Sequence, residues 1–122
     1  MSISNYAELK LLEHITGKTS FTMPSTVYLK LHTGDPGEDC TNNAATESTR
    51  KSTSWAAASS GSIATNATVE WTNVSTTETY THWSAWDAST SGNPLWSGAL
   101  SSSAAVTAGD TFQITSLTLS LD

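Results

Sequence analysis

Three histidines are the side chains best suited to acid–base chemistry or metal binding in this 122-residue chain: His14, His32 and His82. Their spacing does not match the i, i+4 pair of a helical zinc motif, and no carboxylates accompany them in a metal-ligand pattern. His14 falls near the end of an expected helix, where an imidazolium would interact favourably with the helix dipole. His82 lies between aromatic residues, which favours a packed core or an interface. The histidines therefore predict no metal site.

Serine and threonine contribute 20 and 21 residues, which raises the hypothesis of a hydrolase nucleophile. No serine lies in a G-x-S-x-G sequence, and Ser48-Thr49-Arg50-Lys51 matches Ser-x-x-Lys without a companion motif. The members of a catalytic triad need not be close in sequence, so a triad stays open at this stage. With so many hydroxyl groups, a serine near a histidine is expected by chance. We predict no enzyme activity and no catalytic residue.

The segment around Gly37 holds the remaining candidate ligands. Asp35, Glu38 and Asp39 offer the oxygen atoms that calcium prefers, but not at EF-hand spacing. Cys40 is the only cysteine, which excludes an intrachain disulfide and a cysteine-based zinc site. The seven glycines are dispersed and form no phosphate-binding loop. We therefore expect no metal and no cofactor.

The charge pattern argues against two classes of partner. The formal net charge is −6, and all five basic residues lie in the first 51 positions. Binding to phosphates needs clustered Lys and Arg, so nucleic acid is not an expected partner. No run approaches the ~20 apolar residues that span a bilayer, and the first ten residues lack the features of an export signal. The expectation is a soluble protein with no membrane partner.

Five tryptophans are more than a domain of this size needs for its core: Trp55, Trp71, Trp83, Trp86 and Trp96. Tryptophan is enriched in the central part of protein interfaces. We predict that most of the five are buried and that one or two lie at a subunit contact. The alternative is a carbohydrate-binding surface, because aromatic rings also stack on sugars.

The elements that must position these residues begin with one helix. Residues 3–16 carry apolar side chains at three- and four-residue spacing, Asn5 and Glu8 have capping-box spacing, and Gly17 is a plausible stop. We assign residues 1–18 to an N-terminal helical arm and residues 19–122 to a β-domain. The helix either covers one end of a sheet or docks on a neighbouring subunit.

Period-two patterns predict strands in the rest of the chain. Thr26–Thr33 is the clearest, and Ala67–Thr72 places Val69 and Trp71 on one face. Thr79–Asp87 is predicted to be a central strand that is covered on both faces. Its side chains point to one face at Tyr80, His82, Ser84 and Trp86, and to the other at Trp83 and Ala85. A turn at Gly92-Asn93 leads to a return strand at 95–100.

Other segments predict loops or a break in a strand. The polar stretch at about 37–55 is long enough to be functional or mobile. The segment 56–61 consists of small residues, and we expect it to be flexible. In 111–121 the apolar side chains switch from even to odd positions, which predicts either a β-bulge near Thr115-Ser116 or a change of sheet there. Together these patterns indicate a mainly β fold, an antiparallel β-sandwich or jelly roll with a short N-terminal helix.

The chain resembles a family of small structural proteins of tailed bacteriophages. These proteins are often labelled tail-fibre-like, and some of them serve as capsid decoration, or cement, proteins. The resemblance covers nearly the whole chain. It rests on the amino-acid sequences and the order of these segments: 9–17, 27–36, 81–88, 92–95, 98–100, 109–110 and 119–122.

The resemblance implies a non-enzymatic component of the virion, made in the host cytoplasm. Our first expectation is a capsid decoration protein that binds the lattice of the major capsid protein and stabilises the head. In that case the N-terminal segment and the loop Glu38–Ser54 would touch the shell, and the β-domain would form a homotrimer. The alternatives are a tail or tail-fibre module that binds tail proteins and, from another class, a carbohydrate-binding β module.

Overall fold

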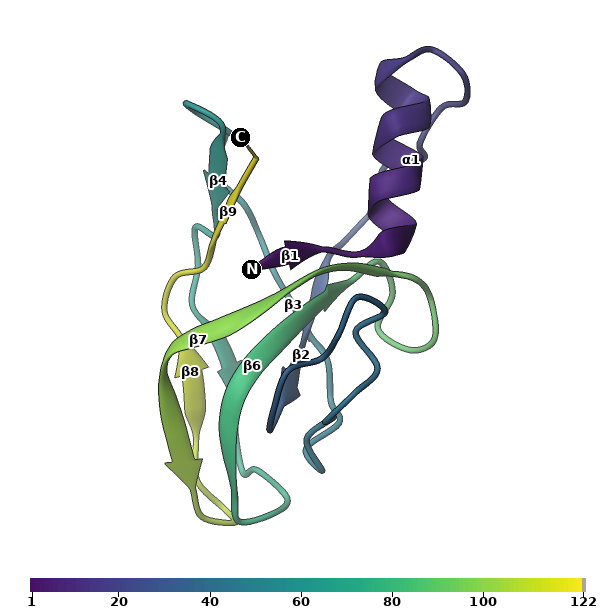
Figure 1. Ribbon diagram of the computed structural model, residues 1–122. Coiled ribbons are helices and arrows are strands. Elements are labelled where there is room, and N and C mark those ends of the chain that lie inside the picture. The colour runs from purple at the N-terminus through teal and green to yellow at the C-terminus, as the bar shows by residue number, and fades with distance from the viewer. Residues whose placement is uncertain (122) are drawn as a thin grey trace.

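The computed structural model describes residues 1–121 and is mainly β, with all strand pairs antiparallel (Figure 1). The elements follow in this order: β1 Ser2–Ile3, α1 Asn5–Ile15, β2 Tyr28–His32, β3 Lys51–Ser52, β4 Ser62–Ala64, β5 Val69–Trp71, β6 Glu78–Trp86, β7 Pro94–Val106, β8 Phe112–Ile114 and β9 Thr118–Ser120.

One five-stranded sheet forms the first layer, in the order β1-β7-β6-β2-β3, and two short pairs, β5-β8 and β4-β9, lie outside it. Val69, Trp71 and Ile114 from β5-β8 pack against Leu29 of β2 and Tyr80 of β6 in one buried cluster. The two layers therefore bury a shared interior, as in a β-sandwich. The prediction of an antiparallel β fold with one N-terminal helix is confirmed.

Helix α1 begins one residue earlier than the capping-box pattern indicated. The N-cap is Ser4, whose side chain accepts a hydrogen bond from Ala7 N at 3.1 Å, so the assignment of the cap to Asn5 was wrong. Ser4 Oγ also donates to Pro94 O at 2.7 Å, which ties the cap to β7. Gly17 follows the C-cap with φ +74°, the left-handed conformation that ends helices, as predicted.

Strand β6 is central, between β7 and β2, as its pattern indicated. Its register to β7 shifts between Tyr80 and His82. This bulge turns Tyr80 into the same core as Trp83 and Ala85, so its predicted assignment to the opposite face was wrong. Trp83 packs on Gly98 of β7, where an added Cβ would lie 2.8 Å from the indole.

In residues 111–121 the switch of the apolar side chains from even to odd positions marks a change of sheet. Phe112–Ile114 pairs with β5, and Thr118–Ser120 pairs with β4. Between them Leu117 N donates to Thr65 Oγ1 at 3.0 Å, and Leu117 is buried. Of the two explanations offered by the sequence, the change of partner strand is correct.

Two segments differ from the sequence expectation. The stretch 56–61 forms one side of a hairpin, because Ser59 and Ser62 exchange backbone hydrogen bonds around Gly61, whose φ is +76°. This turn introduces β4, which the sequence pattern missed. Strand β7 continues to Val106, well past the expected end at residue 100.

Candidate docking groove

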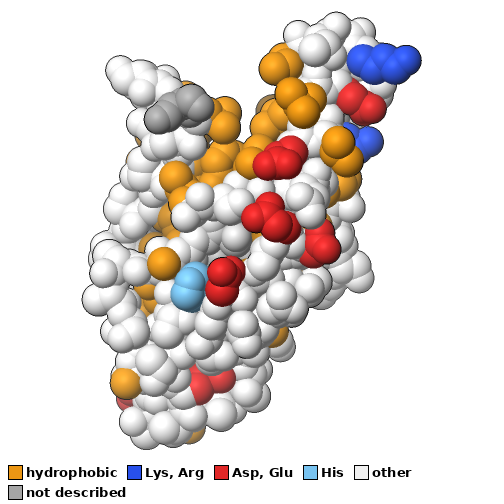
Figure 2. Space-filling view, viewed as in Figure 1, with side chains coloured by type: hydrophobic (Ala, Val, Ile, Leu, Met, Phe, Trp, Pro, Cys, Tyr) orange, Lys and Arg blue, Asp and Glu red, His pale blue; other side chains and the backbone are white. Residues whose placement is uncertain are grey.

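An apolar groove lies between helix α1 and the pair β4-β9, which project from the same end of the sandwich (Figure 1). Figure 2 shows orange, hydrophobic side chains gathered in the hollow between these two projections. The groove has a volume of about 420 Å³. All its lining residues are apolar: Ala7, Leu11, Phe21, Pro24, Val27, Trp55, Ile63, Ala85, Leu95, Trp96 and Leu119.

The walls of the groove follow from two different periodicities. On α1, Ala7 and Leu11 are four residues apart and so share one helix face. Ile63 and Leu119 are paired directly across β4 and β9, so their side chains lie on the same face of that pair. Each element turns one apolar face to the hollow, with Leu95 at its base near the start of β7.

Two of the five tryptophans line this groove, while Trp71, Trp83 and Trp86 are buried. Trp55 and Trp96 are half-buried. Trp55 Nε1 donates to Thr53 Oγ1 at 2.8 Å, and Trp96 Nε1 is buried with no partner among residues 1–121. Neither indole N–H is available to a ligand, so the groove suits apolar side chains rather than a sugar hydroxyl or a charged group.

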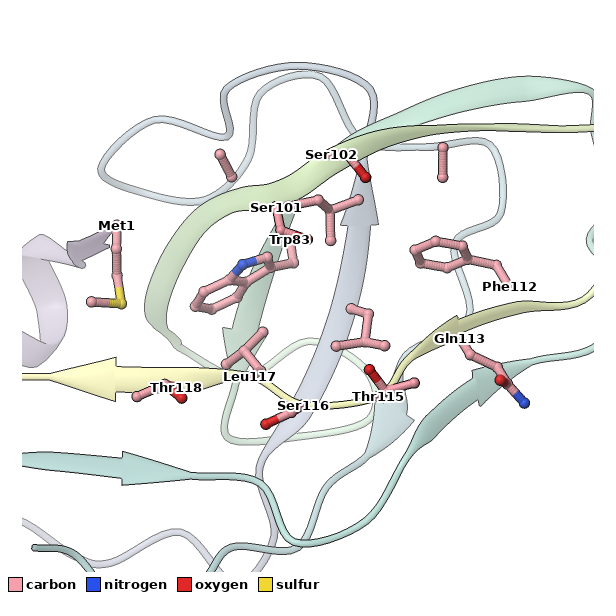
Figure 3. Close-up of a pocket in the computed structure, with 14 residues that line it drawn as sticks. Met1, Trp83, Ser101, Ser102, Phe112, Gln113, Thr115, Ser116, Leu117 and Thr118 are labelled. Atoms are coloured by element: carbon pink, nitrogen blue, oxygen red, sulfur yellow. The ribbon is translucent and has the colours of Figure 1, made fainter.

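A second hollow, of about 460 Å³, opens between β7 and the segment 112–118 (Figure 3). The stick view places Trp83 and Leu117 at its interior, with Ser101 and Ser102 on β7 facing Thr115 and Ser116. Its lining side chains include no acid, base or cysteine. The hydroxyl groups in this hollow therefore have no histidine or carboxylate side chain among its lining residues to act as a general base.

One serine does meet a histidine in the geometry of a catalytic dyad. His32 Nε2 lies 2.7 Å from Ser84 Oγ, and His32 Nδ1 lies 2.8 Å from the Asn42 carbonyl. Because a carbonyl only accepts, Nδ1 carries the proton and Ser84 donates to Nε2. Ser84 Oγ in turn accepts from Trp86 Nε1 at 2.8 Å.

This pair is sealed inside the protein, because Ser84 and His32 both have 0% exposure. Burial lowers the pKa of His32, and the backbone hydrogen bond to Asn42 only partly opposes that shift. A neutral imidazole that no substrate can reach is a structural hydrogen-bonding group. Sequence reasoning missed the contact because it arises from diagonal neighbours on β2 and β6, where Lys30 pairs with Ser84.

The acidic segment and the cysteine have structural roles as well. Asp35 accepts a hydrogen bond from Gly37 N at 2.9 Å. Cys40 is fully buried, and burial raises the pKa of its thiol to about 11. Within residues 1–121 no three His, Cys, Asp or Glu side chains gather closely enough to hold a metal ion.

The other two histidines lie at the surface of the domain. His14 lies in the last turn of α1, as predicted, and its Nδ1 accepts a hydrogen bond from Phe21 N at 3.0 Å. His82 is half-buried beside a small hollow, and its Nδ1 lies 2.8 Å from Thr81 Oγ1.

The long loop at 37–55 is anchored to the domain along much of its length. Glu78 of β6 accepts hydrogen bonds from Thr46 N and Glu47 N, both at 3.0 Å. Arg50 stacks on Trp86, 4.0 Å from the ring centroid, and its guanidinium donates to two carbonyls of the β6-β7 turn. These polar contacts, together with the buried Cys40 and Ala45, hold the loop in place.

Comparison with known families decides the class of protein. A family model described as podophage GP4 fiber I protein gp80 matches residues 2–122. The chain belongs to this family. The resemblance to small virion proteins of tailed phages is thereby confirmed, and family membership makes it a structural component of the phage particle. No curated protein matches the chain. Within residues 1–121, no helix has the length and hydrophobicity to cross a membrane.

Proposed function

We propose that this protein is a non-enzymatic structural module of a podophage tail fibre that binds other tail proteins. The observation that carries the proposal is the match to the fiber I family over residues 2–122. The inaccessible Ser84–His32 pair and the second hollow without ionisable side chains agree with a role that involves no chemistry. The apolar groove supplies a surface for assembly.

Capsid decoration is the second candidate. Its support is the exposed apolar surface on the arm at residues 1–18, where Leu12 and Ile15 are more than half exposed. On a capsid lattice, many weak contacts of this kind act together with high effective concentration. The partner would then be the major capsid protein, contacted by the arm and the loop Glu38–Ser54, with the β-domain forming a homotrimer.

Copy number separates the two candidates. We would measure the number of copies per particle by quantitative gel densitometry of purified virions, with the major capsid protein as internal standard. A fibre module predicts a few tens of copies at most, and hundreds would exclude it in favour of decoration. Complete absence from purified particles would exclude both roles.

A carbohydrate-binding role is a weaker candidate, because the indole N–H of Trp55 is paired with Thr53 Oγ1 and that of Trp96 is buried. The expected result on a glycan array is no binding. Binding that is lost in Trp55→Ala would revive this candidate.

A further inference from the structure

The segment that follows β2 folds back on the sheet and is held there partly by a histidine. His32 ends β2, and residues 33–44 return to it, because His32 and Ala44 form an isolated β-bridge (Figure 1). Within this segment Cys40 is fully buried, with its Sγ atom 3.7 Å from Trp96 O of β7. Residues 33–44 therefore cover part of the five-stranded sheet.

This segment lies outside the apolar core of the sandwich. None of the residues 33–44 belongs to the buried apolar cluster, which the chain rejoins at Ala45. The contact between the segment and the end of β2 is polar, because His32 Nδ1 donates to Asn42 O at 2.8 Å. Movement of the segment away from the sheet would therefore remove no side chain from the cluster.

The hydrogen bonds around His32 are complete only while its imidazole is neutral. Ser84 donates to His32 Nε2 at 2.7 Å and accepts from Trp86 Nε1 at 2.8 Å. A proton on Nε2 would turn this acceptor into a donor, so the hydroxyl proton of Ser84 would lose its acceptor. Ser84 Oγ makes no other hydrogen bond within residues 1–121. A buried donor without an acceptor destabilises the closed arrangement.

No carboxylate compensates a positive charge at this site. The titratable groups that act on His32 are Lys30 on its own strand and His82, its cross-strand partner on β6, and both lower its pKa. The segment supplies the carbonyls of Asn42 and Asn43, which raise the pKa by less than burial lowers it. The ionisable side chains of the segment contribute nothing to the shift: Asp35, Glu38, Asp39 and Cys40.

From these observations we propose that His32 is an acid-sensitive contact whose protonation releases residues 33–44 from the sheet while the sandwich stays folded. In the open form water reaches the imidazolium and Ser84, so neither a charge nor an unpaired hydroxyl stays buried. The apolar cluster is the same in both forms. This inference concerns the conformation of the chain and holds for either role in the virion.

Labelling of Cys40 tests the proposal, because this side chain is 0% exposed in the closed form. The reagent is dithiodipyridine, a disulfide that reacts with thiols in acid as well as at neutral pH. At each pH the rate for the urea-unfolded chain, divided by the rate for the native protein, gives the protection of Cys40. In wild type this protection should be constant above about pH 6.5 and fall by up to ten-fold per pH unit below it.

Two histidine variants assign the proton. His32→Asn should make the protection of Cys40 independent of pH between about 7 and 5, whatever its absolute value. The matched control is His82→Asn, which changes the half-buried cross-strand partner and should still show the fall. Constant protection in wild type would overturn the proposal. So would a fall that survives in His32→Asn or disappears in His82→Asn.

Amide exchange in wild type separates release of the segment from unfolding of the whole domain, and it does not depend on whether His32→Asn folds. Cys40 N donates to Gly37 O, and Asn42 N donates to Pro36 O. The protection of these two amides should fall between about pH 7 and 5 and stay at least about ten-fold below that of β5 and β6. Equal protection of the segment and the strands at every pH would show that residues 33–44 open only when the domain unfolds, and would overturn the proposal.

Discussion

The two ends of this molecule place their hydrophobic residues differently. In the interior of the sandwich, Leu29, Trp71 and Tyr80 are at most 1% exposed. At the end that carries α1 and β4-β9, large apolar side chains such as Ile15 and Met23 are mostly exposed (Figure 2).

This difference indicates which end of the molecule contributes most to its stability. Burial of apolar area is the main favourable term in folding, so the sandwich interior provides most of the stability. The tip of α1 contributes little, because its apolar side chains remain in water. Four changes test this division, from the largest expected effect to the smallest.

The largest effect is expected where the sandwich loses its biggest buried side chain. Trp71 is 1% exposed, and its Nε1 donates to Thr49 O at 2.8 Å. Trp71→Ala should lower the free energy of unfolding by about 3–5 kcal/mol in urea denaturation. Trp55→Ala at the groove should cost less than about half of that. Equal losses from the two changes would show that the groove is part of the core.

A smaller loss is expected when the anchor of the long loop is removed. Glu78→Ala leaves Thr46 N and Glu47 N without their carboxylate acceptor. We expect a loss of about 1–3 kcal/mol and faster proteolysis of the loop. Asp39→Ala, an exposed change in the same loop, is the control and should stay within ~0.5 kcal/mol of wild type. If the two variants behave alike, Glu78 does not anchor the loop.

The buried imidazole predicts a pH dependence. Burial lowers the pKa of His32 below its ordinary 6.5, so the unfolded chain takes up a proton before the folded protein does. Stability should be constant above about 6.5 and fall as the pH drops from there to the lowered folded pKa, by at most ~1.4 kcal/mol per pH unit.

Urea denaturation at a series of pH values would measure this slope. His32→Asn should flatten it, whatever its effect on stability at neutral pH, whereas the surface change His14→Asn should retain it. A slope that survives in His32→Asn would assign the effect to other groups.

The smallest effect is expected at the joint between the two ends. Ser4→Ala removes both the helix cap and the hydrogen bond to Pro94 O, and should cost about 1 kcal/mol, confined to α1. Amide exchange in α1 should rise roughly five-fold, with the sandwich unchanged. Thr16→Ala, at the exposed C-cap, should change exchange less; a matching rise in the sandwich would show that the two ends unfold together.

Local patterns were enough to predict α1, β2, β5 and the β6-β7 hairpin, because alternation and helical spacing repeat over several residues in each. They were insufficient for β4, whose three residues Ser62–Ala64 are too few to show a period. They also missed the length of β7, since the serines and alanines after Leu100 have no apolar alternation. The role of Glu78 was missed because its partners lie more than thirty residues away.

By itself the sequence determined the fold class, the N-terminal helix and the absence of familiar catalytic motifs, since these depend on residue types at short spacing. It also predicted that most of the five tryptophans are buried and that one or two lie at a subunit contact. Only the tertiary structure showed that Trp55 and Trp96 are the two left half-buried, because they meet in the groove through the packing of β7, β4-β9 and α1. The same holds for Ser84 and His32, whose burial turns a potential nucleophile into a structural hydrogen bond.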